Sequence, residues 1–228
     1  MNYLDIIILI FLAFGALLGF KRGFTRQLVA LVGLVVIIIL SFLLKNPISV
    51  FLYSNLPFFN LGGIFKDITI LNILIYEIIA FLIVFFVLLI VYKILIKITN
   101  LFEKILKATI ILSIPSKILG AILGVIENII FTFIVLYILS LPMINFNLIK
   151  NSKIGNTILY HMPVLTSIGN NTLKTFDEIV ELKDEYDNTN NIDEFNNKVI
   201  RKMIDNKVIT EDNVQKLIDS GKIKNVKL

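Results

Sequence analysis

The sequence contains no cysteine and a single histidine, His161, among its 228 residues. The absence of cysteine excludes disulfide bonds, thiolate chemistry and cysteine-based metal sites. One histidine cannot form a histidine pair for a metal or a histidine relay, and we place it in a linker. P-loop, GxSxG and HExxH motifs are missing, as are paired membrane aspartates of the protease type. We therefore expect no enzymatic activity, no metal and no cofactor.

Charge is also scarce, because 17% of the residues are charged and 57% are hydrophobic. Soluble domains have about 25% charged and about 45–50% apolar residues, so the composition excludes a soluble enzyme, a disordered chain and a collagen-like fibre. Residues 1–149 hold five of the 17 acidic residues and 10 of the 22 lysines and arginines. The sequence thus predicts a transmembrane domain over 1–149 and a polar helical tail over 150–228, with no nucleic-acid partner.

Four apolar runs are each close to the roughly 20 residues that a membrane-spanning helix needs. They cover residues 4–20, 28–44, 73–98 and 118–141. The fold class that they predict is an all-α membrane protein with four transmembrane helices. Asp5 lies at the start of the first run and Lys21 follows it, which is the reverse of a signal peptide's charge order. The first run is therefore expected to be an uncleaved span.

The distribution of basic residues predicts the orientation of the protein in a plasma or inner membrane. Lys21, Arg22 and Arg26 lie between the first two spans. Five lysines lie around the connection between the third and fourth spans, and the positive-inside rule places both connections in the cytoplasm. Both termini and the tail then fall on the outer side. The three basic residues of the first connection are also candidates for binding anionic lipid headgroups.

Two connections and the tail have patterns of their own. Residues 46–72 are apolar but interrupted by prolines and glycines, and Tyr53, Asn55 and Asn60 favour an interfacial loop over a re-entrant hairpin. Residues 99–112 predict an amphipathic helix along the cytoplasmic interface. In the tail we expect a linker with short turns over 145–171, followed by helices at 175–186, 193–206 and 211–220.

One glycine motif occurs twice, as GALLG from Gly15 to Gly19 and as GAILG from Gly120 to Gly124. Small residues four positions apart let the backbones of two membrane helices come close together. Gly23 extends the first copy, whereas Asn128 occupies the matching position of the second. A chance match is the alternative, but we favour a packing contact between the first and fourth spans, within one chain or between two.

Three acidic side chains fall within or beside the spans, where a charge at the helix centre costs about 2.5–3.5 kcal/mol on insertion scales. We expect Asp5 and Glu77 at the outer edge, in contact with water. Glu127 lies ten residues after Lys117, roughly 15 Å along its helix, and therefore needs a partner, a proton or a water cavity. Lys93 is the predicted partner. We favour an interhelical pair or a protonated acid over a proton or cation relay.

The opening Asn2-Tyr3-Leu4-Asp5, the run GALLGFKRGFTRQLVALVGL and the later Gly120 and Gly124 together resemble the colicin V production protein family, CvpA. The resemblance covers about residues 1–141 and departs at Asn128, where members have a third small residue. It implies a non-enzymatic, multi-pass bacterial membrane protein that acts in colicin V-type toxin production or export, or in envelope homeostasis. The expected partners are the lipid bilayer, a second copy, or an envelope protein reached through the glycine stripes and the tail. A small channel or proton-coupled transporter using Glu127 is the alternative.

Overall fold

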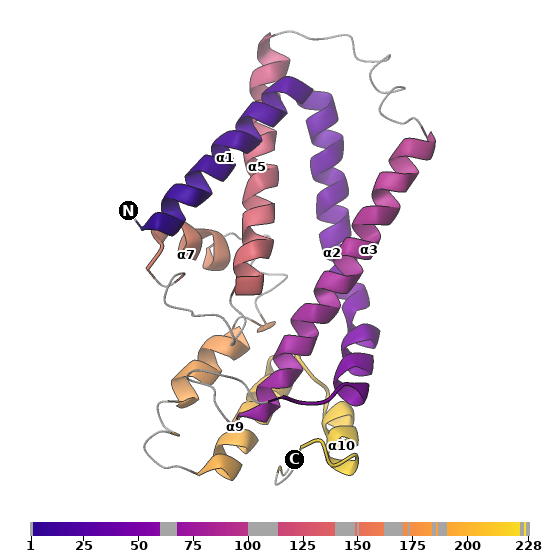
Figure 1. Cartoon of the computed structure of the whole chain (residues 1–228), viewed down its shortest axis with the longest axis vertical. Coiled ribbons are helices and arrows are strands. Elements are labelled where there is room, and N and C mark those ends of the chain that lie inside the picture. Colours follow the sequence, from indigo (N-terminus) through magenta and orange to yellow (C-terminus); the bar gives the residue numbers. More distant parts are fainter. Residues whose placement is uncertain are drawn as a thin grey trace.

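The computed structural model confirms the all-helical class, since the residues that it describes form helices and no strand. The described residues are 2–59, 68–99, 114–139, 149, 151–161, 171–172, 174–183, 186, 191–223 and 226. Four of the helices are long and apolar enough to cross a membrane (Figure 1). They are α1 (Tyr3–Arg22), α2 (Phe24–Asn55), α3 (Asn72–Thr99) and α5 (Ile114–Leu139).

The turn between α1 and α2 is a single residue, Gly23. Its φ of +75° is a left-handed conformation that glycine adopts without a Cβ penalty. The amide of Gly23 donates to the carbonyl of Gly19 at 2.9 Å, so the last turn of α1 keeps its helical hydrogen bond before the chain reverses. The chain therefore returns immediately into α2 (Figure 1), which brings the basic residues around this turn to one end of the molecule.

The second span continues as one helix to Asn55, so the prediction of an interfacial loop is wrong for residues 46–55. Pro47 lies inside α2 and lacks an amide donor, but the helix continues past it. With 32 residues at 1.5 Å each, α2 is about 48 Å long, compared with about 30 Å for the hydrocarbon core of a bilayer. The start of α3, preceded by the 3₁₀ helix η2 (Thr69–Leu71), runs beside this extension.

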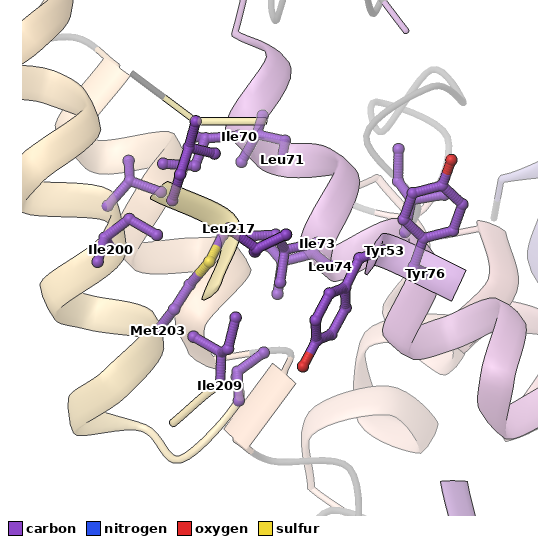
Figure 2. Packing of buried hydrophobic residues seen from close by; sticks show 14 of the residues in the cluster. Tyr53, Ile70, Leu71, Ile73, Leu74, Tyr76, Ile200, Met203, Ile209 and Leu217 are labelled. Atoms are coloured by element: carbon purple, nitrogen blue, oxygen red, sulfur yellow. The ribbon is translucent and has the colours of Figure 1, made fainter. Parts of the chain in front are cut away.

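The buried apolar residues form two clusters, which we call the membrane core and the second core. The membrane core joins α1, α2, α3, α5 and the first tail helix, and includes Ile8, Ile38, Phe81, Phe85, Phe133, Tyr137 and Leu159. The second core joins the end of α2 and the start of α3 to the tail (Figure 2), and includes Tyr53, Ile70, Leu71, Leu74, Ile200, Met203 and Leu217. The tail therefore packs against the helices instead of hanging from them.

The tail contains α7 (Lys153–Tyr160), α9 (Ile192–Asp205) and α10 (Glu211–Asp219), and residues 174–183 are also helical. Helices α7, α9 and α10 each begin at a capping residue whose side chain accepts a hydrogen bond from a backbone amide of the first turn. The capping residues are Ser152, Asn191 and Thr210. The last two helices lie close to their predicted bounds, whereas α7 falls in the predicted linker and corrects it. His161, expected in that linker, ends α7. The predicted amphipathic helix at 99–112 lies outside the described residues after Thr99.

Candidate functional site

Helices α1 and α5 approach each other closely along a seam of glycines. A Cβ built on Gly19 would overlap the carbonyl oxygen of Gly120, and one built on Gly120 would overlap that of Gly19. Gly124 and Gly15 meet in the same reciprocal way. Gly23 extends the seam, since its Cα lies 2.9 Å from a Cβ placed on Gly120. The structure therefore brings all five predicted packing glycines together, backbone against backbone.

Asn128 continues the α5 stripe by one turn beyond Gly124. Its side-chain amide donates to the carbonyl of Phe11 on α1 at 2.6 Å. The amide fits because the facing residue is Gly15, whose Cβ would lie 2.6 Å from Asn128 Cγ. At the position where the sequence departs from the glycine pattern, Asn128 thus forms a hydrogen bond between the same two helices.

Glu127 accepts hydrogen bonds from two side chains of the neighbouring helices. The amide of Gln27, at the start of α2, donates to its Oε2. Arg22, at the end of α1, lies 3.5 Å from the same oxygen and 3.4 Å from Gln27 Oε1. Gln27 is fully buried. These hydrogen bonds link α1, α2 and α5 at the end of the molecule where α1 turns into α2.

The predicted partner of Glu127, Lys93, is wrong, because Arg22 occupies that place. Lys93 lies exposed on α3, and α3 packs mainly on α2. Lys21 is also exposed, and Arg26 is partly buried. Of the three basic residues considered for lipid headgroups, Arg22 therefore has a carboxylate partner within the chain.

Glu77 is buried, which corrects the expectation that water reaches it. Its side chain is 2% exposed and lies 2.6 Å from Nζ of Lys45, which is 12% exposed. Lys45 is 21 residues after Phe24, about 32 Å along α2, so the pair lies near the far boundary of a bilayer of ordinary thickness. The ion pair joins α2 to α3 between the membrane core and the second core.

Asp5 is also buried and does not face water as expected. Its Oδ1 accepts from the hydroxyl of Ser152 at 2.5 Å and from the amide of Ile154 at 3.1 Å, while Oδ2 accepts from the amide of Asn2 at 3.2 Å. Ser152 Oγ in turn accepts from the amide of Gly155 at 2.9 Å. The first acidic residue of α1 therefore anchors the start of α7, whose amides carry the positive end of the helix dipole.

The other end of α7 is tied to the tail through a tyrosine. The hydroxyl of Tyr160 donates to Asp177 Oδ1 at 3.4 Å. Burial and the charge of Asp177 raise the pKa of this hydroxyl, so it keeps its proton and remains a donor at neutral pH. Helix α7 is consequently held at both ends, by Asp5 at its start and by Asp177 at its finish.

Sequence reasoning missed five side chains of these contacts: Gln27, Lys45, Ser152, Tyr160 and Asp177. The available signal was a polar side chain beside an apolar run, at Gln27 and Lys45, because such a residue needs a partner in lipid. Ser152 had only the weak signal of a helix cap. Among the described residues, no cluster of three or more histidine, aspartate or glutamate side chains could hold a metal ion.

A comparison with protein-family models matches residues 4–163 to the family described as Colicin V production protein. The searches of curated proteins and of solved structures each gave no match. The family match covers more than half of the chain, including α1, α2, α3, α5 and α7. Together with four helices suited to crossing a bilayer, it shows a membrane protein related to colicin V production. The chain belongs to the colicin V production protein family, CvpA.

Proposed function

We propose that this protein is a non-enzymatic component of the plasma or inner membrane that supports export of a colicin V-type toxin, or envelope homeostasis, through contacts with a partner protein. The observation that carries the proposal is the second core. In this core, α9 and α10 pack against the last turns of α2 and the start of α3. These turns of α2 lie beyond the roughly 20 residues that a helix needs to cross a bilayer. A folded unit mounted on rigid spans is suited to presenting a surface to a partner.

The proposed orientation places this unit on the outer side. Lys21, Arg22, Arg26 and the lysines at the adjoining ends of α3 and α5 lie at the opposite end of the molecule, which the positive-inside rule assigns to the cytoplasm. A cysteine introduced by Ser220→Cys tests the orientation, since the chain has no other thiol. It should react with a membrane-impermeant maleimide in intact spheroplasts. Reaction only after permeabilisation would reverse the orientation.

The proposed role is tested by complementing a deletion strain and measuring export of a colicin V-type peptide and resistance to detergent. Val199 is fully buried in the second core, whereas its neighbour Lys198 lies on the surface of α9. Val199→Asp should detach the tail and lose complementation, and Lys198→Asp should complement like the wild type. Full complementation by Val199→Asp, at normal protein level and with proven release of the tail, would overturn the role assigned to this unit.

The alternative of a small channel or proton-coupled transporter uses Glu127. The contacts of Glu127 with Gln27 and Arg22 favour a structural role, since two donors on neighbouring helices fix its carboxylate group in place. Proton or cation flux in reconstituted liposomes distinguishes the two. We expect none above that of empty liposomes. Flux that disappears in Glu127→Gln would support the transporter instead.

A further inference from the structure

An apolar groove lies where α1, α5 and α7 meet. Its volume is about 270 Å³, and its walls are formed by Leu12, Ile129, Ile154 and Ile158, with Lys153 and Thr157 at the rim. This volume is slightly below the roughly 300 Å³ at which sites for small molecules begin. It offers room for a single narrow chain.

The residues that line the groove lie at different levels along the spans, from the start of α7 to Leu12 of α1. The start of α7 lies at the level of Asp5, because the amide of Ile154 donates to that carboxylate. Leu12 is seven residues further along α1, about 10 Å deeper. Asn128, beside Ile129, bonds the carbonyl of Phe11 and so places the α5 wall at the same depth as Leu12. A hydrocarbon chain entering from the boundary of this leaflet has the matching direction.

The charge at the rim is positive. Lys153 is exposed and forms no ion pair with a described residue. The nearby Asp5 carboxylate is already enclosed by donors from Ser152, Ile154 and Asn2. The hydroxyl of Thr157 donates to the carbonyl of Lys153 at 2.9 Å. The ammonium group of Lys153 is therefore the group at the rim that is available to a ligand, and its charge favours an anion.

We propose that this groove binds an anionic phospholipid from the leaflet on the side of the tail, with one acyl chain between α1, α5 and α7 and the headgroup phosphate against Lys153. The hydrophobic walls accept the chain, and the lysine distinguishes a net negative headgroup from a zwitterionic one. The proposal is independent of the role in toxin export and of which side of the membrane holds the tail.

Fluorescence quenching tests the proposal, because the chain has no tryptophan and one can be introduced as a local reporter. Leu9 lies on α1 between Asp5 and Leu12 and is 43% exposed; Ile83 on α3 is 41% exposed and serves as the matched control. The full-length variants Leu9→Trp and Ile83→Trp are reconstituted in phosphatidylcholine with equal fractions of brominated phosphatidylglycerol or brominated phosphatidylcholine. We expect phosphatidylglycerol to be preferred about fivefold at Leu9 and not at Ile83, from the attraction of one lysine for an anionic lipid surface.

Two further substitutions in the Leu9→Trp background separate the headgroup from the chain. Lys153→Gln should abolish the preference, whereas Lys97→Gln, at the other end of the spans, should leave it unchanged. Ile129→Phe narrows the groove and should lower quenching by both lipids. Equal preference at the two reporters, preference retained in Lys153→Gln, or a Leu9 reporter that neither lipid quenches would overturn the proposal. Unfolding is monitored by circular dichroism, and each variant compared must retain its helix content.

Discussion

At the residue scale, Glu77, Glu127 and Asn128 of the membrane helices each have a partner on another helix. Glu77 pairs with Lys45, Glu127 with Gln27 and Arg22, and Asn128 with the backbone of α1. Desolvating a charge costs several kcal/mol, and the cost is offset only by a partner with good geometry. The polar residues therefore determine which helices meet and at what depth.

The buried ion pair between Lys45 and Glu77 gives the clearest prediction at this scale. Glu77→Leu leaves the lysine without its partner and should destabilise the protein by about 3 kcal/mol. Lys45→Met in the same chain removes the orphaned charge and should restore most of that loss. Unfolding in mixed detergent micelles, followed by far-ultraviolet circular dichroism, measures both. A double variant as unstable as Glu77→Leu alone would contradict the account.

The hydrogen bond of Asn128 should contribute much less than this ion pair. Interhelical hydrogen bonds in membranes average about 0.6 kcal/mol, because the separated helices also find partners. Asn128→Ala should therefore lower stability by about that amount, as measured in the same unfolding assay. A loss several times larger would mean that Asn128 also supports packing that the contact with Phe11 does not reveal.

At the element scale, the seam between α1 and α5 could be predicted from sequence, whereas the extension of α2 and helix α7 could not. The repeated GxxxG spacing shows which face of each helix lacks side chains, and two such faces are complementary. Pro47 was counted among the breaks that made residues 46–72 a predicted loop, but α2 continues through it although a proline lacks an amide donor and its ring crowds the preceding turn. The environment of Asp5 depends on Ser152, 147 positions later, a contact without local signal.

Adding one methyl group to the seam should separate α1 from α5. Gly19→Ala places its Cβ on the carbonyl of Gly120, a backbone atom that cannot rotate away, so we expect a loss of about 2–3 kcal/mol as for an overpacked core. Ala13→Leu adds a larger group to an exposed position of α1 and is the matched control. Detergent unfolding compares the two. Similar stability of both variants would show that the seam tolerates a side chain.

At the scale of the whole molecule, the tail and the membrane helices share a hydrophobic core. The second core takes its residues from the ends of α2 and α3 and from α9 and α10, so neither part buries its apolar surface alone. The sequence predicted the tail helices but not their location, because an amphipathic helix shows that it has a buried face without showing what covers it. Here the end of α2, η2 and the start of α3 cover it.

Lys222 provides a test of the contact between the tail and the membrane helices, since it links the turn after α10 to the end of α2. Its ammonium donates to the carbonyls of Tyr53 at 3.0 Å and Leu56 at 2.7 Å, which lack helical partners at a C-terminus. Lys222→Met should make the amides of residues 53–56 exchange with deuterium about tenfold faster, because these bonds to a charged group are lost. Lys216→Met, which breaks only an exposed pair with Asp212, should leave that exchange unchanged. If both variants behave alike, the tail does not hold the end of α2, and the second core is a contact that the two parts can lose independently.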